Sequence, residues 1–139
     1  MDTAGYSGTP LARKLGIKDG YKISIINQPE YYFELFTGLP NKIEIIDDPN
    51  VKKDIIHYFV KEGNNLFKDL SILKGQIQKN GMIWISWPKK SSKVITDINE
   101  DVIRTLALKN GLVDIKVCAI DEIWSGLKLV IPVKDRTKL

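Results

Sequence analysis

Stretches of β-branched and aromatic residues, separated by turn-forming residues, predict six β-strands along the chain. The strands are expected at residues 21–27, 42–47, 54–61, 82–87, 112–121 and 124–133. The third of these runs is almost continuously apolar, which is typical of a strand covered on both faces of a sheet. Asp48-Pro49 and Pro88 interrupt the pattern, because proline and aspartate favour turns over central strands.

Helical spacing of apolar residues predicts helices between the strands. Leu66, Leu70, Leu73 and Ile77 recur at spacings of four, three and four residues, which indicates an amphipathic helix over residues 64–81. Asn64 or Asn65 is expected to cap this helix. A second long helix is expected over residues 97–111, with Asp97 or Asn99 as its cap. Short helices are expected over residues 10–15 and 30–36.

Composition indicates one globular domain. The chain has 139 residues, of which 43% are hydrophobic, so residues 1–139 can bury a single core. Residues 1–20 form an N-terminal helical segment in this interpretation, and residues 134–139 a flexible tail. No apolar run approaches the length of about 20 residues that a membrane helix needs, and no signal peptide is recognisable. A single cysteine allows no internal disulfide, so a cytoplasmic location is expected.

Charge narrows the choice of partner. The formal net charge is +4, and the basic residues are mostly lysines interspersed with acids along the chain. Nucleic-acid-binding proteins usually concentrate positive charge on one face, so nucleic acid is not an expected partner. Lys89, Lys90 and Lys93 form the one local basic cluster.

The order of elements from residue 54 to residue 121 is strand, helix, strand, helix, strand, which predicts a parallel α/β sheet. The last two strands are joined by so few residues that they must form an antiparallel hairpin. This ending resembles the C-terminal half of the Rossmann-like methyltransferases that use S-adenosylmethionine. The resemblance implies a three-layer α/β sandwich with a mostly parallel six-stranded sheet of order 2-1-3-4-6-5. Its sixth strand would be antiparallel, in a reduced methyltransferase-like topology.

Three segments resemble a more specific family. YSGTPL near the start, WPKK after the fourth strand and WSGLKLV near the end are similar to those of a bacterial family of small single-domain proteins of unknown function. The resemblance covers nearly the whole chain and supports one domain. It implies no activity.

Candidate binding residues follow from the fold. In such sheets a ligand lies beyond the carboxyl ends of the strands where the strand order reverses, here between the first and third strands. The loop after the fourth strand adds ammonium and hydroxyl groups that suit a phosphate or carboxylate, and Trp87 is expected as a partly exposed aromatic wall. The predicted ligand-binding residues are Asn27, Glu30, Asn64, Ser86, Trp87, Lys89, Lys90, Ser91, Trp124 and Ser125.

A methyltransferase needs a glycine-rich loop after the first strand, so that the backbone can approach the cofactor. This chain has NQPEYYF there, and Tyr31 and Tyr32 are expected to obstruct that approach. Asp47, at the end of the second strand, would hold the cofactor ribose if the chain were a methyltransferase. Ser7, Gly8 and Thr9 precede the first helix and offer either an anion site or a simple cap.

No metal site is predicted, because His57 and Cys118 are the only histidine and cysteine and lie in separate strands.

The sequence leaves two functions open. The first is a non-catalytic binding or regulatory domain with no catalytic residue and no cofactor, whose partner is a small anion or a protein. The alternative is an S-adenosylmethionine-dependent methyltransferase with an atypical loop. The edges of the second and fifth strands offer surfaces for homo-oligomerisation.

Overall fold

A mixed sheet of six strands forms the centre of the protein, with the order β2-β1-β3-β4-β6-β5. The computed structural model describes residues 9–138. The strands are β1 (Lys22–Ile26), β2 (Glu44–Ile45), β3 (Lys53–Phe59), β4 (Ile77–Pro88), β5 (Val113–Ala119) and β6 (Trp124–Val130). β2, β1, β3 and β4 are parallel, and β6 runs antiparallel to both β4 and β5. The predicted fold class, strand order and final hairpin are therefore confirmed.

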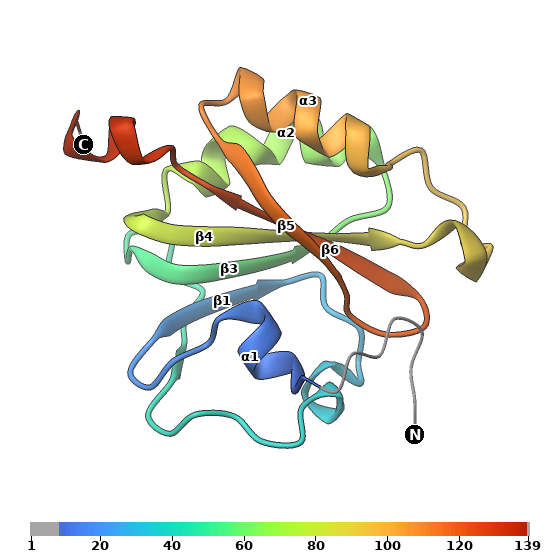
Figure 1. Cartoon of the computed structure of the whole chain (residues 1–139), viewed down its shortest axis with the longest axis horizontal. Helices are drawn as coiled ribbons and strands as arrows, with labels where there is room; N and C mark the ends of the chain where they lie inside the picture. The colour runs from blue at the N-terminus through green and yellow to red at the C-terminus, as the bar shows by residue number, and fades with distance from the viewer. Residues whose placement is uncertain (1–8, 139) are drawn as a thin grey trace.

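The sheet is covered on both faces, which makes a three-layer sandwich (Figure 1). α2 (Gly63–Lys74) and α3 (Glu100–Lys109) lie side by side on one face. α1 (Leu11–Leu15) and the long segment between β1 and β3 lie on the other face. β4 supplies side chains to both layers, since Trp87 packs in the α2/α3 core and Trp84 in the α1 core. The two tryptophans of this strand therefore lie on opposite faces of the sheet.

α1 is attached to the sheet by its last turn. Gly16 ends the helix in the left-handed conformation, with φ 80°, which a glycine adopts without strain. The indole Nε1 of Trp84 donates a hydrogen bond of 3.0 Å to the Leu15 carbonyl, which the helix itself leaves unpaired. Pro10 precedes the first helical residue, and no side chain caps this end. The predicted cap Ser7 lies outside the described residues.

The longest predicted helix is the main error in the secondary-structure prediction. α2 ends at Lys74, and Ile77 begins β4, paired with Lys53 of β3. Ile77 is buried in the same core as Leu66, Leu70 and Leu73, so its apolar character fits either structure. Gly81 lies within β4 where the register shifts, and a β-carbon there would lie 2.9 Å from the Lys53 carbonyl oxygen. Strand pairing with β3 therefore overrides the helical spacing.

Several other elements are shorter than predicted. The segment at residues 30–36 contains a 3-10 helix, η1 (Tyr32–Leu35), and β2 has only two residues. Further 3-10 helices occur at η2 (Lys90–Ser92) and η3 (Val133–Lys138), the second of which overlaps the predicted tail at residues 134–139. The edges of the sheet are β2 and β5, as predicted.

Of the helices in the described part of the chain, none combines the length and apolar character that crossing a membrane requires.

Candidate functional site

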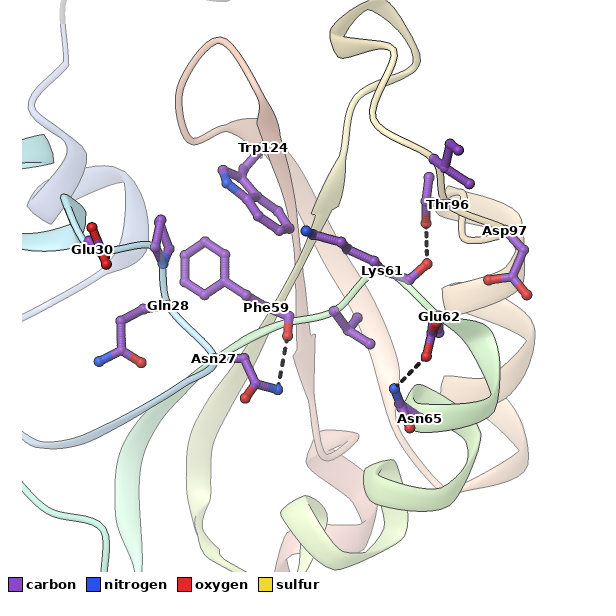
Figure 2. A pocket seen from close by; sticks show the side chains of 13 residues that line it. Asn27, Gln28, Glu30, Phe59, Lys61, Glu62, Asn65, Thr96, Asp97 and Trp124 are labelled. Atoms are coloured by element: carbon purple, nitrogen blue, oxygen red, sulfur yellow. Dashed lines mark hydrogen bonds between the residues drawn. The ribbon is translucent and has the colours of Figure 1, made fainter.

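A crevice of about 960 Å³ opens at the carboxyl ends of β1 and β3, where the sequence predicted a ligand (Figure 2). Its polar lining consists of Asn27, Gln28, Glu30, Lys61, Glu62, Asn65, Thr96 and Asp97. Its apolar lining consists of Pro29, Phe59, Val60, Ile95 and Trp124. An apolar wall with a limited set of polar groups at a switch point of an α/β sheet is typical of ligand sites.

The turn out of β1 forms without a glycine. Asn27 adopts the left-handed conformation with φ 59°, which asparagine tolerates better than other residues with side chains. Its amide Nδ2 donates a hydrogen bond of 3.4 Å to the Phe59 carbonyl at the end of β3. The backbone therefore turns away from the sheet at the position where a glycine-rich loop was expected to be necessary.

Tyr31 and Tyr32 do not obstruct the crevice, so the sequence-based expectation about them is wrong. Tyr32 is buried beneath the loop, and its hydroxyl lies 2.9 Å from Nδ1 of His57. Tyr31 reaches across to the β5–β6 hairpin, where its hydroxyl donates a hydrogen bond of 2.8 Å to the buried carboxylate of Asp121. Burial, followed by the contact with Asp121, raises the pKa of the Tyr31 phenol. Neither ring lines the crevice.

The loop before α3 forms the wall opposite β1. Thr96 Oγ1 donates a hydrogen bond of 2.5 Å to the Lys61 carbonyl, and Figure 2 shows this bond at the crevice edge. Asp97 Oδ1 accepts one of 2.7 Å from the Gly63 amide, the first residue of α2. The predicted caps Asn64 and Asn65 are wrong, because the carboxylate of Asp97 takes that role from another loop. The positive end of α2 is therefore already paired with a negative charge.

The crevice lining carries more negative than positive charge. Glu30, Glu62 and Asp97 are carboxylates, and Lys61 is the only basic residue among the lining residues. Figure 2 shows the Lys61 ammonium pointing toward the Trp124 ring, at the inner end of the crevice. Such a lining attracts cations and repels simple anions.

An aromatic pair forms the inner wall of the crevice. The rings of Phe59 and Trp124 meet edge to face, with centroids 5.0 Å apart. Both residues are buried, and only part of each faces the crevice. Trp124 was predicted as a site residue, and its position on β6 next to the hairpin brings it to the carboxyl end of β3.

The structure separates the predicted residues after the fourth strand from the crevice. Ser86 is fully buried, and its hydroxyl lies 2.7 Å from Nε2 of His57. Trp87 is 7% exposed within the α2/α3 core, so its predicted role as a partly exposed wall is wrong. The Lys89 amide donates to the Ile123 carbonyl at 2.7 Å, which turns the loop toward the hairpin. Lys89, Lys90 and Ser91 do not line the crevice.

The remaining predicted residues are scattered. Asn27 and Glu30 line the crevice, Asn64 lines a neighbouring hollow between α2 and α3, and Ser125 lines a groove along β5. Asp47 does not reach the crevice, because β2 pairs only with the start of β1 and the chain then turns back. Its negative charge acts instead on Lys53, at the amino end of β3.

Ten lining residues are absent from the predicted set. Seven of them lie at or after the carboxyl ends of β1 and β3, where the topological rule alone could have found them: Gln28, Pro29, Phe59, Val60, Lys61, Glu62 and Asn65. The other three, Ile95, Thr96 and Asp97, precede α3. Asp97 was expected as a helix cap, but nothing in the sequence indicated that it would cap α2. Within residues 9–138, no group of three or more histidine, cysteine, aspartate or glutamate side chains is placed to hold a metal ion.

Solved structures of methyltransferases share this fold. An S-adenosylmethionine-dependent methyltransferase from Aquifex aeolicus superimposes with a TM-score of 0.59 at 13% identity, over 88% of this chain and 88% of that chain. A putative methyltransferase from Thermoplasma acidophilum gives 0.57 at 6% identity, over 85% and 71%. The magnesium protoporphyrin IX methyltransferase from Synechocystis PCC 6803, solved with bound S-adenosylmethionine, gives 0.55 at 11% identity, over 88% and 74%.

These identities are low, so the likeness establishes the fold alone. No family model matches the sequence, and no curated protein matches it. The resemblance to a bacterial family of unknown function therefore stays a prediction.

Proposed function

We propose that the crevice binds S-adenosylmethionine and that the protein is an S-adenosylmethionine-dependent methyltransferase. The observation that carries this proposal is the acidic, unobstructed crevice at the switch point of a methyltransferase-like sheet. S-adenosylmethionine carries a sulfonium and an ammonium against one carboxylate, so its net charge is positive. Glu30, Glu62 and Asp97 complement that charge, and they oppose the small anion that the sequence suggested.

Each part of the lining has a role in this proposal. When bound, S-adenosylmethionine supplies an electrophilic methyl group on a positively charged sulfur. The carboxylates hold a cationic ligand, and the amides of Asn27 and Gln28 offer donors and acceptors for its polar groups. Phe59 and Trp124 exclude water from the inner end of the crevice. Since the demethylated product has lost the sulfonium charge, the acidic lining binds it less tightly and favours its release.

A second candidate is a non-catalytic binding domain, which one observation favours. β1 is followed by η1, a four-residue 3-10 helix, and the first long helix follows β3 instead. A long helix starting after β1 would direct its N-terminal amides at a bound cofactor, and this chain lacks that contribution within its described residues. In this case the crevice would bind a cationic nucleoside without transferring a methyl group.

Thermal unfolding with S-adenosylmethionine, S-adenosylhomocysteine and sodium phosphate tests the binding proposal. Ligand at 100 times its dissociation constant should add about 2.7 kcal/mol of stability. The double variant Glu30→Gln/Glu62→Gln should weaken S-adenosylmethionine by about 1 kcal/mol, roughly fivefold, for each charge removed. It should weaken the uncharged-sulfur product much less. Glu34→Gln/Glu44→Gln removes two exposed carboxylates outside the crevice and serves as the matched control.

Two outcomes separate the candidates. Stabilisation by phosphate but by neither adenosyl compound would contradict the proposal. Stabilisation by S-adenosylmethionine, without transfer of a tritium-labelled methyl group to any fraction of a cell extract, would favour the non-catalytic domain.

A further inference from the structure

A second concave surface lies on the α1 side of the β5–β6 hairpin. We call it the α1–β5 groove; it has a volume of about 590 Å³, and its basic lining residues are Arg13, Lys14 and Lys116. No carboxylate lines it, and none of its lining residues lines the acidic crevice. The hairpin separates the two, since Trp124 faces the crevice and Ser125 faces the groove.

Lys116 and Lys128 form an unfavourable cross-strand pair beside this groove. They are register partners on β5 and β6, so their side chains project from the same face of the sheet. Like charges in directly opposite positions destabilise a sheet. Burial lowers the pKa of Lys128, and the positive charges of Lys116 and Lys18 lower it further. Folding therefore brings these ammonium groups together at a cost that an anion between them would offset.

α1 adds further positive charge to the same surface. Lys14 Nζ donates a hydrogen bond of 3.3 Å to the Ala119 carbonyl at the end of β5, and Arg13 is exposed next to it. The charges of Lys14 and Lys116 both act on Cys118, which lines the groove. Two elements of the sheet and one helix thus direct cations at one surface.

These cations lack carboxylate partners among the described residues. No described carboxylate pairs with Arg13, Lys18, Lys116 or Lys128. On the opposite face of the sheet, Arg104 pairs with Glu100, Asp101 and Asp114. The acids of α3 therefore pair on the face of the sheet opposite the α1–β5 groove.

We propose that the α1–β5 groove binds the phosphate backbone of a nucleic acid. Three cations line the open groove, and two more lie near it, since Lys128 is the cross-strand partner of Lys116 and Lys18 lies close to Lys128. Such a spread of charge suits a chain of phosphates better than one enclosed phosphate. Four of these five cations are lysines, whose ammonium groups contact phosphates as point charges. No aromatic residue lines the groove to stack on bases. Binding is therefore independent of base sequence and sensitive to salt.

Fluorescence anisotropy with labelled single-stranded oligonucleotides tests this proposal. A twelve-nucleotide poly(U) and a twelve-nucleotide poly(dT) should bind with similar affinity, which falls steeply as salt rises. For single strands, the slope of log affinity against log salt is about 0.7 for each phosphate contacted. Lys116→Gln/Lys128→Gln should weaken binding roughly tenfold and reduce the slope by about 1.4. Unfolding curves should show this variant folded and no less stable, since a repulsive pair is removed.

The matched control is Lys68→Gln/Lys109→Gln, which removes two exposed lysines from α2 and α3 on the other face. It should retain wild-type affinity and slope. Equal losses in both double variants would show a general effect of net charge and overturn the proposal. Poly-glutamate competing as well as poly(U) at equal charge would overturn the choice of nucleic acid. Displacement of poly(U) by millimolar inorganic phosphate at constant ionic strength would show a site for single phosphates and also overturn it.

Discussion

The hydroxyl of Tyr32 lies 2.9 Å from Nδ1 of His57, and the hydroxyl of Ser86 lies 2.7 Å from Nε2 of the same ring. All three side chains are buried beneath the loop that leaves β1. A neutral imidazole has one donor and one acceptor, and either hydroxyl can match either role. The network thus satisfies a buried histidine in its uncharged form and joins β3 and β4 to the segment that follows the crevice loop.

We predict that the free energy of unfolding falls between pH 7 and pH 5 because of His57 alone. Burial lowers the pKa of His57 from 6.5 to about 3. Below pH 6.5 the His57 imidazole therefore binds a proton in the unfolded chain but not in the folded chain, so acid favours unfolding. The loss amounts to about 2 kcal/mol over this interval. Urea unfolding at several pH values measures it.

His57→Gln is the control for this prediction, because His57 is the only histidine in the chain. The variant is expected to be less stable at pH 7 but nearly independent of pH from 7 to 5. A pH dependence as steep as that of the wild type would assign the effect to other groups.

Tyr32→Phe should lower the free energy of unfolding more than Tyr31→Phe does. Tyr32→Phe leaves a buried ring nitrogen without a partner, which costs about 1–3 kcal/mol. Tyr31→Phe removes a bond from a half-buried phenol, and Asp121 keeps its bonds from the Ile123 and Trp124 amides, so the cost should stay below about 1 kcal/mol. Denaturant unfolding of the two variants compares them, and the reverse order would contradict the role of the His57 network.

Asn27→Ala is expected to destabilise the protein more than Asn27→Gly. The backbone at Asn27 has φ 59°, where an alanine costs about 1–2 kcal/mol and a glycine is unstrained. The glycine variant loses only the long bond to the Phe59 carbonyl. If thermal melting showed equal losses, the amide contact rather than the backbone conformation would be the reason for asparagine.

Variants of Asp97 separate its charge from its hydrogen bond. Asp97→Asn keeps an oxygen acceptor for the Gly63 amide and should cost about 0.3–1 kcal/mol through the helix dipole. Asp97→Ala removes the acceptor as well and should cost up to about 2 kcal/mol. The difference in free energy of unfolding between the wild type and Asp97→Asn should become smaller at high salt. Asn99→Ala, which removes the cap of α3, is the reference for an uncharged cap.

The candidate site could be predicted only in part from the sequence. Asn27, Glu30 and Trp124 line the crevice, because its position depends on the strand order and on the residues that follow each strand. The wall formed by the loop before α3 was not predicted. The sequence placed the loop after β4 there, but β4 continues through Trp87 and Pro88, and the loop after it turns toward the hairpin through the Lys89–Ile123 bond. Ile95, Thr96 and Asp97 occupy that wall instead. Local sequence does not specify which of two loops closes a crevice.

Periodicity, turn residues and the short final connection predicted the alternating strands and helices and the closing antiparallel hairpin, because these follow from local hydrogen bonding and chain length. The full strand order, and with it the place of the crevice, came from the resemblance to Rossmann-like methyltransferases. Only the tertiary structure decided which side chains face that crevice and which charges meet. Tyr31 and Tyr32 turn away into buried hydrogen bonds, Ile77 joins a strand, and lysines distant in sequence become neighbours across β5 and β6. Packing and long-range pairing outweigh local preference at these positions, and a linear pattern does not contain that information.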